Sequence, residues 1–224
     1  MEKSDDSFVS EIEGYLGSFE KHLPRQLDPV ALSRAKLPFS PVAYRETLSW
    51  RVTELGRAAM DGFNQRRLAA ALLLTRGAVE TSAALWYLSE KIANAVKTGE
   101  LADLRNLLMR LSHGTRNWEE TPGAVNVLTF VDTVDRKVEG FRRQYDCLSE
   151  VAHPNYSGTT GLFSRNDPDN FMVYFGSDVR NTEATRRIGL VNLSVALMLF
   201  EHTYNSLAEL MPGFIALCEK SLPS

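Results

Sequence analysis

The fold of this chain is decided by the stretch Leu68-Ala-Ala-Ala-Leu-Leu-Leu-Thr-Arg-Gly-Ala-Val-Glu-Thr-Ser-Ala-Ala-Leu-Trp86. It lies in a predicted helix from Arg66 to Lys97, and apolar residues occupy almost every face of that helix. A helix of this kind is surrounded by other helices. Arg76 and Glu80 interrupt the apolar run before it is long enough to cross a bilayer, so no membrane span is predicted.

Two helices are predicted before this stretch. Large apolar residues recur at threes and fours from Phe8 to Phe19, with charged residues between them, which indicates an amphipathic helix. A proline-rich connector follows. Ser40 and Pro41 then have the pattern of an N-cap and a first helical position, for a helix that runs to about Gly62.

Three helices and a hairpin are predicted after it. A short helix runs from Leu101 to about Leu111 and ends in a polar loop. One apolar stripe of about seven turns predicts the next helix, and its members are Leu128, Val131, Val134, Val138, Phe141, Tyr145, Leu148 and Ala152. Two β-prone runs around an Asn/Asp/Pro turn predict a hairpin over residues 158–176, which needs packing against helices to persist. The last helix runs from about Thr182 to Met211 and stops near Pro212.

This order predicts an all-α fold, a multi-helix up-and-down bundle with a small β-hairpin inserted before the last long helix. Residues 1–224 form a single domain, in which residues 1–40 are the N-terminal helix and connector. The chain is long enough for one sizeable core, since 44% of its 224 residues are hydrophobic.

Composition excludes several classes of function. The formal net charge is -3, so no global basic field would hold a long nucleic acid. Two cysteines, Cys147 and Cys218, indicate neither a disulfide framework nor a thiolate metal site, which suits the cytoplasm. The first six residues lack the apolar core of a signal peptide. No Walker loop, dinucleotide fingerprint, Gly-x-Ser-x-Gly elbow or His-Glu-x-x-His motif is present, and no cofactor is expected.

The stretch from Tyr145 to Tyr156 contains the candidate catalytic residues. Tyr145, Ser149 and His153 are four residues apart, so they form one polar ladder along a helix. Pro154 puts His153 in or beside the last helical turn, where the helix dipole favours its protonation. His153 could then donate or accept a proton with Ser149 holding it. The structural alternative, which is the commoner one, is that the three groups satisfy one another or a neighbouring backbone.

Arg76 and Glu80 need partners because isolated charges in an apolar helix are costly to desolvate. One alternative is an ion pair within the helix, at its edge. The other is that both point into the bundle and meet the ladder, in a ligand-binding pocket of Arg76, Glu80, Tyr145, Ser149 and His153, with Asn155 in the turn beside it.

Two further patterns are weaker. Glu150-Val-Ala-His153 has the spacing by which di-metal bundles place two ligands on one helix face, but no second copy occurs, so no metal site is expected. Positive charge gathers around the fourth helix next to Trp118, where Arg110 and Arg116 could contact a phosphate or nucleic acid. Solvated loop charges are the commoner outcome of such a pattern.

Arg76-x-x-x-Glu80 in a central helix and Tyr145-x-x-Leu-Ser-x-x-x-His153 in a later one together resemble bacterial proteins of the HEPN-like superfamily, over about residues 45 to 210. The resemblance implies a helical bundle, often a homodimer, in toxin-antitoxin or phage-defence systems. Many such proteins are metal-independent ribonucleases with an Arg-x4-6-His site, and no histidine here has an arginine at that distance. Non-catalytic members are thought to bind nucleotides or partner proteins.

We therefore expect a cytoplasmic HEPN-like binding or interaction module, a homodimer through its first and last helices, with a partner protein, RNA or a nucleotide as its ligand. A ribonuclease that uses His153 together with an arginine is the alternative. A metal-dependent bundle enzyme is the second alternative.

Overall fold

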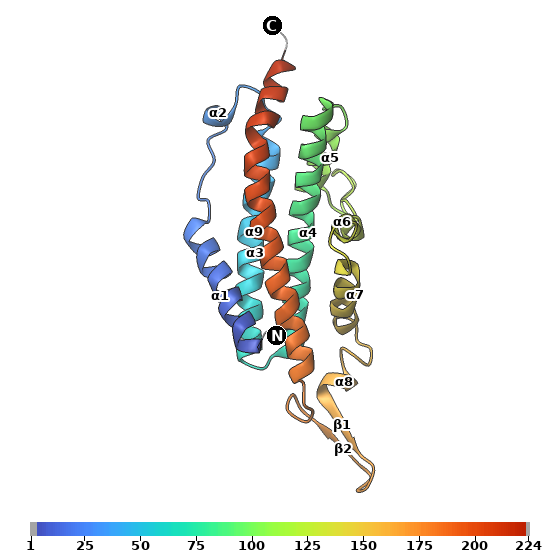
Figure 1. Cartoon of the computed structure of the whole chain (residues 1–224). Helices are drawn as coiled ribbons and strands as arrows, with labels where there is room; N and C mark the ends of the chain where they lie inside the picture. The colour runs from blue at the N-terminus through green and yellow to red at the C-terminus, as the bar shows by residue number, and fades with distance from the viewer. Residues whose placement is uncertain (1–3, 223–224) are drawn as a thin grey trace.

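A computed structural model describes residues 4–222 of the chain as an elongated helical bundle (Figure 1). Its long helices are α1 (Asp5–His22), α3 (Phe39–Asn64), α4 (Leu68–Thr98) and α9 (Glu183–Lys220). The all-α bundle with a hairpin before its last long helix is thus confirmed. Each of these helices starts within three residues of its predicted start, because the apolar residues whose spacing predicted it also face the core.

α4 lies at the centre, as its composition predicts. It packs against α3, α9, α6 and α7, and fourteen of its residues are buried. Many of these are alanine or serine, which let neighbouring helices approach closely. Ser82, for example, donates a hydrogen bond of 2.8 Å to the Ala196 carbonyl of α9. α4 is also long and apolar enough to cross a membrane by length and composition, but 56% of its most apolar window is buried inside the bundle, as is typical of the core helix of a soluble protein.

α1 is part of the bundle. Arg57 of α3 binds Glu13 at 2.6 Å and Glu20 at 2.9 Å on α1, and Ser194 of α9 donates to Glu11 at 2.9 Å. The first and last helices, predicted as the surface of a homodimer, therefore pack against each other within one chain. A short helix, α2 (Pro29–Leu32), lies in the connector.

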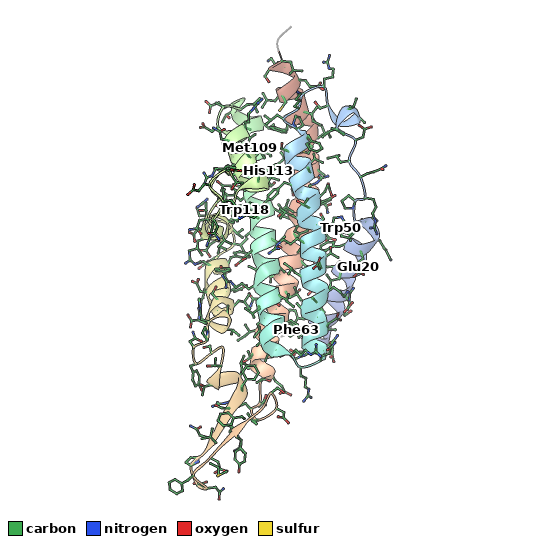
Figure 2. The ribbon with its side chains drawn as sticks, turned by 180° about the vertical axis from the view of Figure 1, so that it is seen from behind. Glu20, Trp50, Phe63, Met109, His113 and Trp118 are labelled. Atoms are coloured by element: carbon green, nitrogen blue, oxygen red, sulfur yellow. The ribbon has the colours of Figure 1, made fainter. Side chains whose placement is uncertain are left out.

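The N-cap prediction at Ser40 was wrong. α3 begins at Phe39, after Pro38, so Ser40 and Pro41 lie inside its first turn. Proline fits there because the first turn of a helix has no partner for its N–H groups. The connector is held to α3 by Trp50, whose indole nitrogen donates to the Pro24 carbonyl at 2.9 Å (Figure 2).

The predicted seven-turn helix is two helices, α6 (Val127–Asp135) and α7 (Phe141–Ala152), after α5 (Leu104–His113). The chain turns at residues 136–140, where Gly140 has a φ of 84°. The Asp135 carboxylate caps α7 by accepting the Arg142 backbone N–H at 2.9 Å. Val138, a member of the predicted stripe, is 36% exposed at the break. The apolar pattern of the sequence continues across the break because α6 and α7 both pack against α4.

α9 passes through Pro212 and ends at Lys220, so the predicted stop was wrong. Pro212 is exposed, and therefore the carbonyl it leaves without a helical partner can bond to water. Beyond it, Phe214 and Cys218 are buried and continue the apolar face.

The hairpin is confirmed, but it is shorter than predicted. Residues 160–163 form a helical turn, α8 (Thr160–Phe163), and only then come β1 (Ser164–Asp167) and β2 (Met172–Phe175). The strands are antiparallel, with Ser164 opposite Phe175. The hairpin projects beyond the end of the bundle (Figure 1). Its main contacts are between its own strands and with α8, so the expected packing against helices is limited chiefly to that short helix.

Candidate functional site

The structure brings together three of the predicted site residues. Arg76 Nη2 donates a hydrogen bond of 2.9 Å to the Tyr145 hydroxyl, and that hydroxyl donates one of 3.0 Å to Glu80 Oε1. Arg76 Nε lies 3.1 Å from the same carboxylate oxygen, as an ion pair. The guanidinium carbon also lies 5.2 Å from the centroid of the Tyr145 ring. Charges from two turns of α4 are thus joined by one hydroxyl of α7.

This cluster is partly buried, with 28% of the Arg76 side chain and 25% of the Glu80 side chain exposed. Burial acts to lower the pKa of Arg76, but the hydrogen bond to Tyr145 and the charge of Glu80 outweigh it, and the pKa is raised. The guanidinium therefore stays charged, and the polar groups of Arg76, Glu80 and Tyr145 are engaged with one another. Such an arrangement fastens α7 to α4 more readily than it moves protons.

The lower half of the predicted ladder does not join this cluster. Ser149 Oγ is buried and has no hydrogen-bond partner among residues 4–222, so it does not hold His153. His153 follows the last residue of α7, with extended backbone angles (φ −91°, ψ 148°), and is exposed. It is eight residues from Tyr145, about 12 Å along a helix axis. The predicted pocket of five residues is therefore wrong in its second half, because the chain leaves helical geometry before Pro154.

Asn155 is used by the turn that follows α7. Its side-chain nitrogen donates to Glu150 at 2.8 Å, and its side-chain oxygen accepts the Gly158 backbone N–H at 3.1 Å. Both ends of the amide are engaged, so its contacts are those of a turn residue.

The positive patch near Trp118 is a loop surface. Arg110 Nε donates to the Gly123 carbonyl at 2.9 Å and so holds the loop against α5. Arg116 and Trp118 are exposed, and Trp118 lies on the loop side of the bundle (Figure 2). Arg110 also lines a cleft between the end of α4 and α5, whose lining does not include Arg116 or Trp118.

No group of three or more His, Cys, Asp or Glu side chains in the described part of the chain is placed to hold a metal ion. Glu150, the partner in the Glu-x-x-His spacing, hydrogen-bonds to Asn155 instead. The described residues thus offer no ligand set of the di-metal type.

Two features were not foreseen in the sequence. The first is the exposure of the second β-prone run of the hairpin, Phe171-Met-Val-Tyr-Phe175, whose five large apolar residues have exposed fractions from 39% for Tyr174 to 95% for Phe171. The alternation typical of a half-buried strand is missing from this run, and that was the available signal.

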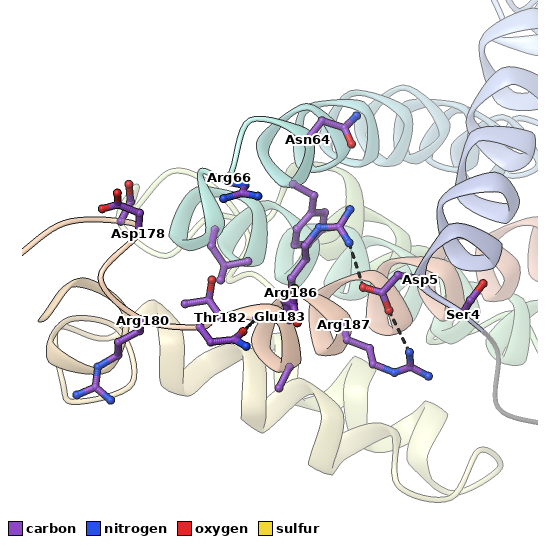
Figure 3. A pocket seen from close by; sticks show the side chains of 15 residues that line it. Ser4, Asp5, Asn64, Arg66, Asp178, Arg180, Thr182, Glu183, Arg186 and Arg187 are labelled. Carbon is purple, nitrogen blue, oxygen red and sulfur yellow. Dashed lines mark hydrogen bonds and ion pairs between the residues drawn. The ribbon is translucent and has the colours of Figure 1, made fainter. Parts of the chain in front are cut away.

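The second is a cleft of about 830 Å³ at the hairpin end of the bundle, lined by four arginines (Figure 3). They are Arg66, Arg180, Arg186 and Arg187. Sequence reasoning missed them because they come from different segments; the pairs Arg66-Arg67 and Arg186-Arg187, each at a helix end, were the signal.

Comparison with protein-family models, with curated proteins and with solved structures found no match to this chain.

Proposed function

We propose that this protein is a binding and interaction module that assembles with a second copy of itself through the hairpin. The observation that carries the proposal is the exposed run Phe171–Phe175 on a hairpin whose main contacts are between its own strands and with the short helix α8. Exposed apolar patches of this kind are typical of interaction sites. A two-stranded hairpin is also only marginally stable alone in water, so a partner would complete it.

The charge pattern of the hairpin indicates which edge would pair. β1 carries Arg165 and Asp167, and charged side chains are a common protection of a free strand edge. β2 and its flanks, residues 171–176, carry no charge. The β2 edge is thus the unprotected one.

A second copy fits this edge better than an unlike strand. Two β2 strands that pair antiparallel about a two-fold axis would form one four-stranded sheet, and the pairing is self-complementary. Because β2 has no charges, no like-charge repulsion opposes it. This dimer differs from the one expected on the first and last helices.

The HEPN-like assignment stays a prediction, with which a helical bundle is compatible. A role in bacterial defence or in a toxin-antitoxin system stays a prediction as well. We propose a cytoplasmic location, since Cys147 and Cys218 are both free thiols. We do not favour the ribonuclease alternative, because His153 is separated from the Arg76 cluster.

Sedimentation velocity of the purified protein tests the proposal. We expect the wild type to be a dimer and the double variant Val173→Lys/Phe175→Lys to be a monomer. The new lysines of one β2 strand would face those of the other, and like charges repel across paired strands. Circular dichroism should show the same helix content in both.

The matched control is Met109→Lys/Trp118→Lys, which adds the same charges to apolar residues of similar exposure elsewhere, 46% and 71% against 48% and 79%. It should remain a dimer. A wild type that is monomeric at every accessible concentration, or a hairpin variant that still dimerises, would overturn the proposal, as would a hairpin that captures only an unlike protein.

A further inference from the structure

The cleft at the hairpin end of the bundle is assembled from four separate segments (Figure 3). They are the start of α1, the turn between α3 and α4, the loop over residues 177–182 that returns from the hairpin, and the first turns of α9. Its volume of about 830 Å³ is within the range of sites that hold cofactors and nucleotides. None of its lining residues belongs to the Arg76 cluster or to β2.

The charges of the cleft are unlike those of the whole chain. Four arginines face three acids, Asp5, Asp178 and Glu183, so the cleft is net positive in a protein whose formal net charge is -3. All four cations are arginines. The planar guanidinium fork matches two oxygens of a phosphate at once, which an ammonium group does not do.

Asp5 orients two of these arginines. Its Oδ2 lies 3.0 Å from Arg186 Nη1, and its Oδ1 lies 3.1 Å from Arg187 Nη1. Both arginine side chains are about two-thirds buried, with 31% and 34% exposed. One carboxylate thus serves two guanidinium groups and fixes their positions.

Arg66 occupies a position that normally belongs to glycine. α3 ends in a motif in which the Arg66 and Arg67 backbone N–H groups donate to the Phe63 and Gly62 carbonyls, at 3.3 and 2.8 Å. The residue at this point is left-handed and most often glycine. Arg66 adopts it with a φ of 57°. Its side chain forms no hydrogen bond or ion pair with any of residues 4–222 and lines the cleft.

Arg66 is exposed, so its guanidinium is open to a ligand in the cleft, while its left-handed backbone is fixed by the end of α3. Arg180 also lines the cleft. Its Nε donates to the Ser164 carbonyl, and this bond holds the side chain in place. Asn64 and Asn181 also line the cleft, and the side-chain oxygen of Asn181 accepts the Glu183 backbone N–H at 2.9 Å.

We propose that this cleft binds a small phosphate-bearing ligand of the size of a nucleotide, with its phosphates on Arg66 and Arg186. The first turn of α9 adds the positive end of a helix dipole to the same site. The volume is several times that of a single phosphate ion, so the remaining part of the ligand fills the space between the loop and α3.

Isothermal titration at constant ionic strength tests this, with ADP as the probe and inorganic phosphate for comparison. We expect ADP to bind, and more tightly than phosphate. Arg66→Gln should weaken ADP binding about tenfold or more, since it removes a charge-assisted contact. Arg66→Gly should weaken binding as much and yet raise the melting temperature, because it relieves the left-handed backbone.

Arg105→Gln is the matched control, because it removes the same charge from an exposed residue of α5 outside the cleft. It should bind ADP like the wild type. No binding of ADP, equal binding of ADP and phosphate, or equal losses in Arg105→Gln and Arg66→Gln would overturn the proposal.

Discussion

Tyr145 shows how much one hydroxyl does in this structure. It accepts a hydrogen bond from Arg76 and donates one to Glu80, so a cation and an anion of α4 are both bound to α7. Without it, the two charges would keep their 3.1 Å ion pair but lose their link to the neighbouring helix.

We expect Tyr145→Phe to lower the free energy of unfolding by about 1–2 kcal/mol, since a hydrogen bond to charged groups is lost while the ring stays packed. Urea denaturation followed by circular dichroism measures it. Tyr156→Phe is the control, because that side chain is 64% exposed, and its effect should stay within about 0.5 kcal/mol. Equal effects of the two substitutions would show that the Tyr145 hydroxyl stabilises nothing.

At this scale the sequence predicted half of the site. Arg76, Glu80 and Tyr145 could be brought together in advance, because charges in an apolar helix need partners and a tyrosine on an apolar stripe needs one too. His153 could not be placed in the same way. Its position depends on where α7 ends, and helix ends are the least certain part of any pattern of spacing.

Among the helices, close approach explains features that spacing alone does not. Gly189 of α9 is buried, and a Cβ there would lie 2.5 Å from Phe63 and 2.8 Å from Leu72. Three helices, α3, α4 and α9, therefore meet at this glycine. In contrast, a Cβ on Gly14 of α1 would meet nothing within 4 Å.

The same substitution should thus have opposite effects at the two sites. Gly189→Ala should destabilise the protein by about 1–3 kcal/mol, because overpacking outweighs the better helix propensity of alanine. Gly14→Ala should stabilise it by up to about 1 kcal/mol. Thermal unfolding of the two variants beside the wild type measures both shifts. A stabilised Gly189→Ala would mean that Phe63 can move aside without cost.

Two of the helix boundaries that were predicted wrongly show what an apolar period leaves out. The break between α6 and α7 is set locally, by a cap from Asp135 and by the left-handed Gly140, although the apolar stripe runs on across it. The passage of α9 through Pro212 is set by tertiary packing, because Phe214 and Cys218 beyond it are buried. Periodicity reports which face is apolar, and it does not report whether the axis is continuous.

For the whole molecule, the uncovered hairpin makes a prediction that needs no substitution. Chymotrypsin cuts after large apolar residues, so it should cut dilute protein first within residues 171–175. If β2 pairs with a second copy, this cut should slow as protein concentration rises, while tryptic cleavage near the exposed Arg116 should not change. Gel electrophoresis with mass spectrometry of the fragments measures both rates. A chymotryptic rate that is independent of concentration would contradict pairing through β2.

The bundle itself followed from the sequence because nearly every buried helix face repeats at threes and fours. The cleft did not, because Arg66 is more than a hundred residues before Arg180, Arg186 and Arg187 and meets them only when α9 returns beside the turn between α3 and α4. Charges that are distant in the chain carry no signal of their meeting in a single sequence.

Asp5 orients Arg186 and Arg187 from the first turn of α1, and its neighbour Ser4 also lines the cleft. A purification tag joined just ahead of Ser4 would therefore place extra polypeptide beside the cleft. The last turn of α9 lies at the opposite end of the bundle (Figure 1). Immobilisation, labelling and affinity capture are therefore best done beyond the end of α9, which leaves the arginines accessible.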